Sequence, residues 1–338
     1  MRIEQLDPGD ADRIRACFRV FRAAERVDEP EGPWFTERPF GGWLTVGWGG
    51  DPREIWLAAD QDSVLGWYRL ELPDKENSDQ ASLDLVVHPA QRRRGLGRGL
   101  LRHAAARAAA HGRTVLNGQV RNGSAGQAFC RSAAAEPGLV DVQRVLELGK
   151  MDDGMLAQLR EPAERAAAGY SLASWTGPVP GGFIEQAAAL YAALNDAPRD
   201  PAIAPETWDA QRVRERVNEL RPRYGLRTYS VAARHRATGE LAGLTELAVD
   251  PADPEWGHQM LTAVIPGHRG HRLGLRLKIA MLEWLAAAEP QLERIHTWNA
   301  RANAHMIAVN EALGYTVLGQ PSTCYRLDVA AVPGPAQS

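Results

Sequence analysis

The chain has 338 residues, which is too many for one compact core and about right for two domains of roughly 150 residues each. Its 44% hydrophobic and 24% charged residues are typical of a globular protein, and a formal net charge of −3 argues against a dedicated nucleic-acid binder, which usually has a basic balance. The three cysteines, Cys17, Cys130 and Cys324, lie far apart without a CxxC spacing, which excludes a disulfide framework and a thiolate zinc site and favours a reducing compartment.

The hydropathy of the chain predicts no membrane partner. No apolar stretch approaches the roughly 20 residues that a membrane-spanning helix needs. The first residues, Met1 to Glu4, do not have the pattern of a signal peptide. We therefore expect a cytoplasmic protein that binds neither a membrane nor a nucleic acid.

The first half of the chain predicts a hairpin followed by a strand, a loop and a helix. Apolar runs at 55–59 and 64–72 predict the hairpin, which turns at 60–62. An apolar strand from Leu83, a basic glycine-containing loop at 92–97 and an amphipathic helix over 98–111 follow. The helix is expected to end at Gly112, before a strand over 114–120.

The second half repeats this order, and Arg92 and Arg269 are 177 positions apart. The corresponding hairpin strands are 229–233 and 241–247, and the corresponding strand, loop, helix and strand are 261–265, 269–274, 275–288 and 294–298. We therefore predict a first domain over 1–150, a helical linker over 151–169, a second domain over 170–331 and a disordered tail over 332–338.

The repeated loop is suited to bind an anion. A glycine-containing loop that enters a helix presents free backbone N–H groups at the positive end of the helix dipole, which favours a pyrophosphate. Gly95 and Gly97 allow close approach of the backbone, and arginines at 92, 93, 94 and 98 supply charge. A run of arginines at a helix start is otherwise only a solvated face, but its repetition in a matching context favours the binding function.

The loop sequences resemble the Arg/Gln-x-x-Gly-x-Gly/Ala motif of the GNAT superfamily of acyl-CoA-dependent N-acyltransferases. The segment Arg92–Gly97 matches the motif in full, and Arg269–Gly274 matches it except that Arg272 replaces the first glycine. The segment Asn303–Tyr315 resembles a second motif of the superfamily, which ends in LGY or LGF. The resemblance covers roughly 40–150 and 225–330, and the tandem layout is similar to that of mycothiol synthase-like two-domain acetyltransferases of actinobacteria.

The resemblance implies an α/β fold (α+β mixed) of two tandem GNAT-like domains, each a mixed, mostly antiparallel sheet splayed at a central bulge with helices on both faces. It implies acetyl-CoA or another acyl-CoA as co-substrate and no metal. The pantetheine arm would pair with backbone groups of the strand before each loop, and the loop would bind the pyrophosphate. The implied CoA-binding residues are Val86, Val87, Arg92, Arg93, Arg94, Gly95, Leu96, Gly97 and Arg98 in the first half, and Val264, Ile265, Arg269, Gly270, His271, Arg272, Leu273, Gly274 and Asn303 in the second.

The superfamily's general base is often a carboxylate or histidine about eleven residues before the loop. Formation of an amide needs a neutral amine, and an alkylamine is mostly protonated at pH 7. The base position is His258 in the second half and Ala81 in the first, and Glu246 on the preceding strand is a second candidate. Asp84 lies on the strand of the first half but not at that position. An ordinary packed imidazole and a half-exposed strand carboxylate are the alternative interpretations of His258 and Glu246.

The superfamily's general acid is usually a tyrosine on the short last helix, which here corresponds to Asn310 in the second half and Cys130 in the first. An asparagine does not donate a proton, and Cys130 is expected to be a buried apolar residue. A CoA thiolate leaves fairly well without help, so this departure does not forbid catalysis. Because only the second half has a base candidate and an intact last helix, we predict that it is catalytic, with His258, Glu246 and Asn310 at the catalytic positions, and that the first half binds CoA.

The expected activity is transfer of an acyl group, most simply acetyl, from coenzyme A to the amine of a small molecule by a monomer or homodimer. One alternative is a catalytically inactive CoA- or metabolite-binding module, which the missing tyrosine and the replaced glycine favour. Another is an acyltransferase that acts on a protein amine. The sequence does not identify the acceptor.

Overall fold

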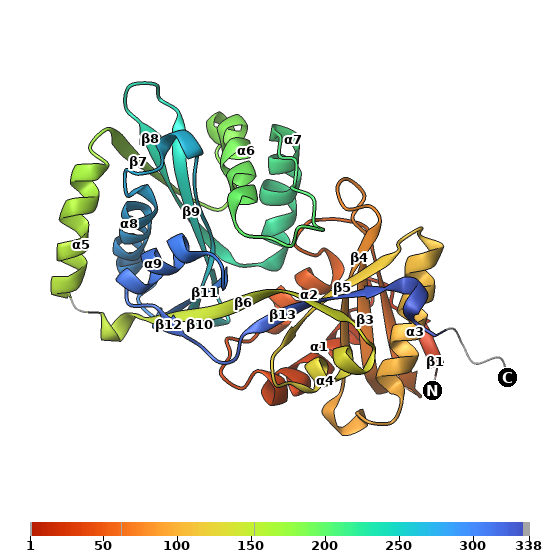
Figure 1. The fold of residues 1–338 in the computed structure, drawn as a ribbon. Helices are drawn as coiled ribbons and strands as arrows, with labels where there is room; N and C mark the ends of the chain where they lie inside the picture. The colour runs from red at the N-terminus through yellow and green to blue at the C-terminus, as the bar shows by residue number, and fades with distance from the viewer. Residues whose placement is uncertain (1, 62, 152, 334–338) are drawn as a thin grey trace. The chain divides into compact units, whose positions relative to one another are not determined.

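A computed structural model describes residues 2–61, 63–151 and 153–333 of the chain. The structure divides into two compact units, and both contain helices and a mixed sheet (Figure 1). Unit 1 comprises Met1–Asp141, Asp200–Ala204 and Gly319–Ser338, and unit 2 comprises Val142–Arg199 and Pro205–Leu318.

Unit 1 contains the first predicted hairpin, strand, loop and helix in the expected order. Its elements are β1 (Arg2–Gln5), α1 (Ala11–Asp28), α2 (Glu37–Thr45), β2 (Arg53–Asp60), β3 (Ser63–Glu71), β4 (Gln80–Val87), α3 (Leu96–Ala110), β5 (Val115–Arg121), α4 (Ala125–Ser132), the first part of β6 (Glu136–Glu147) and β13 (Ser322–Asp328). The strand order is β1-β2-β3-β4-β5-β13-β6, in which β4 and β5 are parallel and the other neighbouring strands are antiparallel.

Helices cover both faces of the sheet of unit 1. On one face, Tyr68 and Leu70 of β3 are buried against Leu100 and Ala104 of α3. On the other face, α1 contacts β3 and β4, and the buried indole of Trp67 donates a hydrogen bond to the Cys17 carbonyl oxygen at 3.1 Å. Successive side chains of β3 therefore point to opposite faces of the sheet, and both faces are buried.

Unit 2 repeats this architecture. Its elements are the second part of β6, α5 (Asp153–Ala166), β7 (Tyr170–Thr176), α6 (Ile184–Ala192), α7 (Ala210–Arg212), a π-helical segment (Val213–Leu220), β8 (Arg227–His235), β9 (Leu241–Asp250), β10 (Asp253–Val264), α8 (Leu273–Ala288), β11 (Arg294–Ala300), α9 (Ala304–Ala312) and β12 (Thr316–Val317). The strand order is β6-β11-β10-β9-β8-β7, β12 pairs with β6, and β10 and β11 form the parallel pair.

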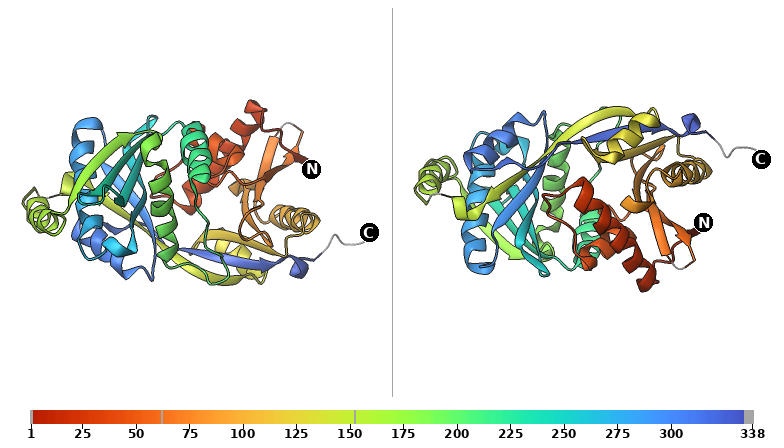
Figure 2. Two further views of the ribbon diagram at one scale, coloured as in Figure 1. Left: turned by 90° about the horizontal axis from the view of Figure 1, so that it is seen from above. Right: turned by 90° about the horizontal axis from the view of Figure 1, so that it is seen from below.

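Two hydrophobic clusters lie on the two faces of the sheet of unit 2. Val231 and Leu247 pack with α8, whereas Ala232 and Leu244 pack with α6. The views from above and below show α6 and α8 on either side of the strands β8 to β10 (Figure 2). The predicted fold, with helices on both faces of a mixed sheet in each half, is confirmed.

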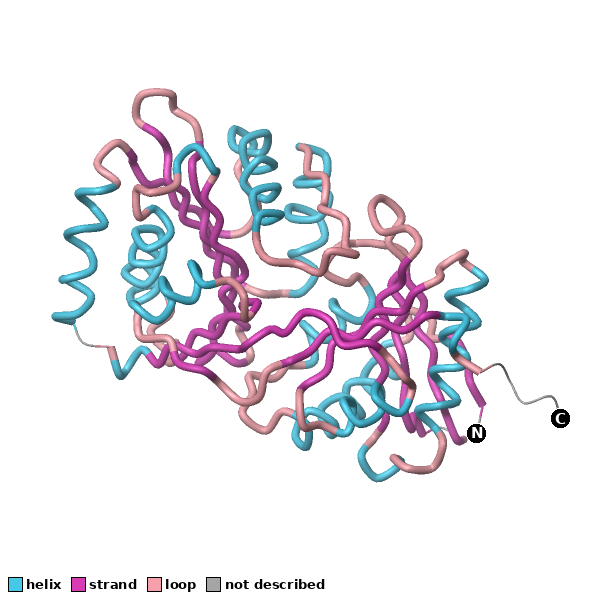
Figure 3. The backbone as a smooth tube through the Cα atoms, viewed as in Figure 1, coloured by secondary structure: helices cyan, strands magenta, loops and turns pink. Residues whose placement is uncertain are grey.

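The compact units differ from the predicted ranges at both ends of the second half. The last strand, β13, pairs with β5 over Ser322–Asp328 and with the first part of β6, so it completes the sheet of unit 1 (Figure 3). The second part of β6 belongs to unit 2 instead. The pairing of β13 with β5 and β6 joins segments that are far apart in the sequence. Local hydropathy does not indicate which strands pair over such distances.

The segment predicted as a linker is part of unit 2. The helix α5 buries Ala163 in the cluster formed with α8, and Leu156 and Leu159 pack against that cluster. Two ion pairs also join the helices, Arg160 with Glu283 at 2.6 Å and Arg276 with Glu164 at 3.1 Å. Of the tail predicted over 332–338, residues 334–338 lie outside the described part of the chain.

Candidate functional site

Each unit passes from a strand into a helix through a loop with two residues in the left-handed conformation. In unit 1 these are Arg93 and Gly95, with φ of 65° and 81°. In unit 2 they are Gly270 and Arg272, with φ of 87° and 53°. The two loops therefore share one backbone geometry, and glycine and arginine are exchanged between its two left-handed positions. Arg272 takes the place of the expected glycine at a conformational cost of about 1–2 kcal/mol.

The loops place free backbone N–H groups at helix starts. Gly95 is the N-cap residue of α3 and Arg272 is the N-cap residue of α8, and neither has a side-chain cap. The first N–H groups of a helix have no partner within the helix, and they lie at the positive end of its dipole. Both loops can therefore hold an anion such as a pyrophosphate.

The first arginine of each loop fixes the loop to its own unit. The Nε atom of Arg92 donates to the carbonyl oxygen of Val87 at 3.2 Å, and the guanidinium forms two hydrogen bonds with Asp28, at 3.0 and 2.6 Å. Arg269 does the same with Val264 at 3.2 Å and Asp196 at 2.5 Å. These two side chains, expected to bind CoA, have carboxylate partners that also hold the loop in position.

The remaining arginines of the first loop are exposed. Within the described part of the chain, Arg93 and Arg98 have no hydrogen-bond or ion-pair partner. Arg94 donates to the Gln91 side chain at 3.1 Å. In the second loop Arg272 and His271 are exposed as well. Exposed guanidinium groups beside free N–H groups can provide bidentate contacts to phosphate oxygens.

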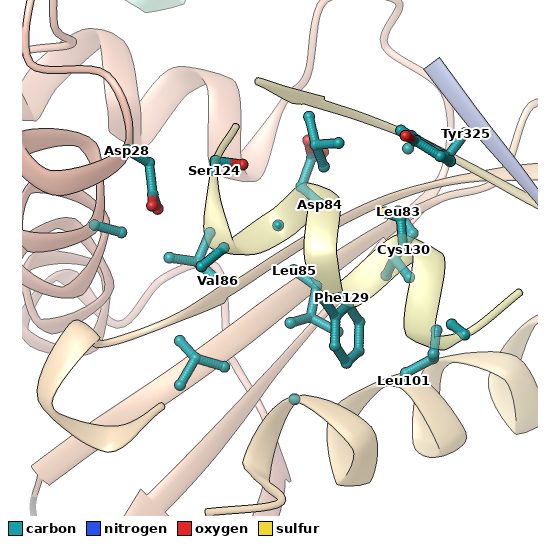
Figure 4. A pocket seen from close by; sticks show the side chains of 18 of the residues that line it. Asp28, Leu83, Asp84, Leu85, Val86, Leu101, Ser124, Phe129, Cys130 and Tyr325 are labelled. Atoms are coloured by element: carbon teal, nitrogen blue, oxygen red, sulfur yellow. The ribbon is translucent and has the colours of Figure 1, made fainter. Parts of the chain in front are cut away.

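A cavity of about 740 Å³ opens beside the loop of unit 1. It lies where β4 and β5 diverge, because their parallel pairing covers only Gln80–Ser82 with Val115–Asn117. Figure 4 shows side chains of β4, of α3 and of α4 around it, with Asp84, Leu101, Phe129 and Cys130 labelled. Of the residues predicted to bind CoA in this half, seven line the cavity: Val86, Val87, Arg92, Arg93, Gly95, Gly97 and Arg98.

The carboxylates of this cavity have arginine partners. Asp84 accepts two hydrogen bonds from Arg69, at 3.0 and 2.7 Å, and Glu29 pairs with Arg121. Glu25 lies near Arg22, but burial raises the pKa of Glu25 to about 8, so it is mostly neutral at pH 7. The pairing of Asp84 does not leave a carboxylate that can readily act as a base.

The expected bulge is found in β10 of unit 2. The register between β9 and β10 shifts between Gln259 and Leu261, immediately after the last parallel pair of β10 with β11, His258 with His296. The corresponding pair of unit 1, β3 with β4, keeps one register from Gly66 to Glu71. A bulge turns backbone groups out of the ladder, so unit 2 has the geometry that can present N–H groups to a carbonyl oxygen.

His258, the predicted base, is hydrogen-bonded to a second histidine. Its Nδ1 atom lies 2.5 Å from Nε2 of His296, whose Nδ1 atom lies 3.1 Å from the side-chain nitrogen of Gln143. Burial lowers the pKa of His258 to about 4, although the charge of Asp250 opposes this shift. The imidazole is therefore neutral at pH 7. Sequence reasoning missed His296, since its pairing opposite His258 depends on the register of two strands.

Glu246, the second base candidate, is 2% exposed and has several partners. One carboxylate oxygen accepts from the Tyr191 hydroxyl at 2.8 Å, and the other accepts from Arg221 at 2.7 Å. The partly buried guanidinium and the hydroxyl hold the carboxylate with two charge-assisted hydrogen bonds. This geometry assigns Glu246 to a fixed charge pair next to the site.

The general-acid positions hold no phenol. Asn310 is fully buried, its amide donates to the Asn299 side-chain oxygen at 2.8 Å, and its own Oδ1 atom has no partner among the described residues. Cys130 lines the cavity of unit 1, and burial raises the pKa of its thiol to about 11. Asn303, predicted to bind CoA, is the N-cap residue of α9 and accepts from the Met306 N–H at 3.3 Å.

One ionisable residue of unit 2 escaped the sequence reasoning. Lys278 lies in the apolar run of α8 and is only 2% exposed. Its Nζ atom contacts the Gln259 side-chain oxygen at 3.2 Å, and Gln259 is the residue at the bulge. A lysine within an otherwise apolar helix face is the sequence signal that could have indicated it.

The described residues offer neither a metal-binding cluster nor a membrane-spanning helix. They contain no group of three or more histidine, cysteine or acidic side chains that could hold a metal ion. No helix among them is both long enough and apolar enough to cross a membrane.

Both halves of the chain match models of acetyltransferase families. Residues 51–133 match the family described as "Acetyltransferase (GNAT) domain", and residues 188–315 match the one described as "Acetyltransferase (GNAT) family". The chain is 29% identical to a mycothiol acetyltransferase of Sanguibacter keddieii over 321 residues, which cover 92% of each protein. It is 28% identical to a mycothiol acetyltransferase of Mycolicibacterium smegmatis over 232 residues, 68% of this chain and 69% of the relative.

Solved structures resemble the whole chain. A tandem GNAT protein from the clavulanic acid biosynthesis pathway, in a structure without AcCoA, aligns with a TM-score of 0.79, 28% sequence identity and 99% coverage of both chains. A GCN5-related N-acetyltransferase from Sphaerobacter thermophilus aligns with a TM-score of 0.66 over 98% of this chain and 96% of its own. The second structure is only 16% identical and supports the fold alone.

Proposed function

This chain is a tandem GNAT acetyltransferase, and from that membership we propose that unit 2 binds acyl-CoA and transfers its acyl group, while unit 1 binds CoA without transferring an acyl group. GNAT acetyltransferases use acetyl-CoA as co-substrate, and the activity of the chain is acyl-CoA-dependent N-acetyl transfer. We propose the amine of a small molecule as acceptor. The relatives named mycothiol acetyltransferase support this acceptor class.

The observation that carries the assignment to unit 2 is the bulge of β10 beside His258. Unit 1 has Ala81 at the base position, a continuous β3–β4 register and an Asp84 that is paired with Arg69. Unit 2 combines an imidazole that is neutral at pH 7 with strand N–H groups freed by the register shift. A neutral base and an oxyanion site are the two elements that attack of an amine on a thioester needs.

In this proposal His258 accepts the proton of the attacking amine, directly or through a water molecule. Backbone N–H groups between the bulge and Val264 stabilise the negative charge on the carbonyl oxygen. Glu246, on the neighbouring strand β9, is hydrogen-bonded to Arg221 at 2.7 Å. Orientation of the amine against the thioester contributes roughly 7–11 kcal/mol, which exceeds the contribution of a base.

The residues of unit 1 fit acyl-CoA. The loop N–H groups and the exposed Arg93 and Arg98 suit the pyrophosphate, and the apolar walls of the 740 Å³ cavity suit the pantetheine arm, for which Val86 and Val87 offer strand backbone. The rest of the predicted set stays a prediction: Arg94 and Leu96 in unit 1, and in unit 2 Val264, Ile265, Gly270, His271, Arg272, Leu273 and Gly274.

Release of CoA with a panel of small amines tests the proposal. We expect acetyl-CoA consumption that depends on one class of small amine, with stoichiometric amide formation observed by mass spectrometry. Calorimetry of acetyl-CoA binding should show weaker binding for Arg93→Ala/Arg98→Ala. Binding of acetyl-CoA without turnover of any amine would favour the inactive binding module. Transfer only to peptides or proteins would favour the protein-acceptor alternative.

A further inference from the structure

We propose that Lys278 is a catalytic residue of unit 2, which donates a proton to the CoA thiolate as the carbon–sulfur bond breaks. The inference rests on the proposed function, because it requires acyl transfer in unit 2. It supplies the group that is missing at the general-acid position, where Asn310 cannot donate a proton to a thiolate.

Lys278 differs from the other lysines of the chain in its environment. The sequence has three lysines, and Lys75 and Lys150 are exposed, whereas Lys278 is 2% exposed. Buried lysines usually have a carboxylate partner. Among the described residues, no carboxylate lies within ion-pairing distance of the Lys278 Nζ atom. Such a placement is costly for folding, which is typical of a residue kept for function.

The surrounding groups hold the ammonium at the bulge. Three oxygens lie within hydrogen-bond distance of the Gln259 side-chain nitrogen and share its two N–H groups: Thr245 Oγ1 at 3.1 Å, the Glu246 carbonyl at 2.7 Å and the Leu261 carbonyl at 2.9 Å. These bonds orient the Gln259 side-chain oxygen towards Lys278, 3.2 Å away. The Tyr315 ring lies on another side, with its centroid 5.2 Å from Nζ. The amine of Lys278 therefore has a defined position next to Gln259, where the register between β9 and β10 shifts.

The internal repeat relates Lys278 to a residue that lines the cavity of unit 1. Lys278 is 177 positions after Leu101, the same spacing that relates the two loops. Leu101 lines the cavity of unit 1 together with Cys130, which occupies the general-acid position of that unit (Figure 4). The general-acid positions Cys130 and Asn310 are 180 positions apart, so the repeat relates Leu101 and Cys130 to Lys278 and Asn310 with a shift of three residues in the second pair. The backbone N–H of Tyr315, whose ring contacts Lys278, also donates to the Asn310 carbonyl at 3.0 Å.

The charge state of Lys278 suits a proton donor. Its neighbours are the neutral amide of Gln259 and the phenol of Tyr315, whose pKa is raised by burial, so neither stabilises the ammonium as an ion pair would. The Glu246 carboxylate is paired with Arg221. Burial lowers the pKa of Lys278 to about 7. An acid is most effective when its pKa lies near the working pH, and a thiolate whose conjugate thiol has a pKa of about 8.5 can take a proton from it.

The proton balance of the step is complete. The amine nitrogen forms a bond to the carbonyl carbon and gives its proton to His258 or water. The carbon–sulfur bond then breaks, the sulfur keeps the electron pair, and the Lys278 ammonium supplies the proton that turns the thiolate into a thiol. Neutral Lys278 regains a proton from solvent, and the products are the amide and free CoA.

Direct titration of Lys278 tests its proximity to the sulfur without measuring activity. In protein labelled with ¹³C-lysine only three side chains give signals, and the Lys278 signal is assigned with Lys278→Arg. We expect it to titrate near pH 7 in the free protein. Saturating CoA should raise this pKa, because the thiolate lies near the ammonium, whereas desulfo-CoA, which lacks the sulfur, should not. Equal titration with both ligands would overturn the proposal.

Kinetics with two leaving groups tests the proton transfer. Lys278→Met keeps the length of the side chain in an apolar site, and Lys150→Met is the matched change at an exposed lysine. With acetyl-CoA we expect kcat of Lys278→Met to fall roughly 10²-fold and to lose its decrease above pH 7. The selenoester analogue of acetyl-CoA releases a less basic selenolate, so Lys278→Met should use it nearly as fast as the unaltered protein.

Two results separate this proposal from the proposed function. An equal loss with the thioester and the selenoester would assign Lys278 a structural role and overturn the proton donation. Full activity of Lys278→Met with acetyl-CoA, in a protein that His258→Ala slows, would overturn it while leaving transfer in unit 2 intact. Loss of activity in Asp84→Ala but not in His258→Ala would instead reject unit 2 as the transfer site.

Discussion

Lys278 and His258 are ionisable side chains that unit 2 buries in their neutral or partly neutral forms. Burial lowers the pKa of Lys278 to about 7 and that of His258 to about 4, and in both cases loss of solvation is the main cause. Both groups lie near the bulge of β10. Lys278 contacts Gln259 at the bulge, and His258 precedes Gln259 in the sequence. At pH 7 this part of unit 2 therefore contains a neutral imidazole and a partly protonated amine.

Replacing Lys278 by methionine should stabilise the protein. The unfolded chain binds a proton at Lys278 up to about pH 10 and the folded chain only up to about pH 7, so the stability of the unaltered protein rises with pH across this window. We expect Lys278→Met to raise the free energy of unfolding by on the order of 3–5 kcal/mol at pH 6–7 and by progressively less towards pH 10.

Urea unfolding at several pH values, with Lys150→Met as the control, measures this difference. A gain that is independent of pH would mean that Lys278 does not lose its proton on folding. A gain in stability together with the expected loss of activity is what a strained functional residue should give.

At the scale of the elements, the strand–loop–helix unit was predictable because each of its features is local. The arginines and glycines of the loops lie within six residues, and the helices that follow have apolar residues at helical spacing. Local sequence did not reveal that Arg92 and Arg269 pair with Asp28 and Asp196, since these partners lie 64 and 73 positions away. The sequence also placed Glu246 on a strand, as observed, but did not indicate its ion pair with Arg221.

The left-handed position at each helix start predicts opposite effects of glycine in the two loops. Arg272→Gly should stabilise unit 2 by about 1 kcal/mol, because glycine has no penalty at φ of 53°. Gly95→Ala should destabilise unit 1 by a similar amount, since its φ is 81° although the space around it is open.

Gly99→Ala is the matched control in α3. Its added Cβ also meets open space, but Gly99 lies within the helix, where alanine should stabilise by roughly 0.5–1 kcal/mol. Denaturant unfolding measures all three variants. Stabilisation by Gly95→Ala would contradict the left-handed N-cap.

At the scale of the whole molecule, the chain order and the compact units do not coincide. The strand β13 follows all of unit 2 in sequence but lies between β5 and β6 in the sheet of unit 1. Pairing of segments about 200 residues apart leaves no mark in hydropathy, so the sequence predicted the number of domains and their fold but not these boundaries. For the same reason the sequence indicated His258 as a base candidate but not its hydrogen bond to His296.

Removal of residues 319–338 should loosen unit 1 before unit 2. Tyr325 and Leu327 of β13 are buried, and their burial alone contributes about 3–6 kcal/mol. In hydrogen-exchange mass spectrometry we expect β5 to lose protection while β9 and β10 keep theirs. A chain that ends at residue 333 is the control. Unchanged protection of β5 in the shorter chain would contradict the assignment of β13 to unit 1.

The rate of acetyl transfer by His258→Ala tests the central claim, transfer in unit 2 with His258 as base. An alkylamine has a pKa near 10.4 and is mostly protonated at pH 7, so a base is needed there and less so at high pH. With saturating acetyl-CoA and an alkylamine, we predict a kcat about 10²–10⁴-fold lower at pH 7 and partial recovery as the pH rises towards 10. Full activity of His258→Ala at pH 7 would contradict the claim.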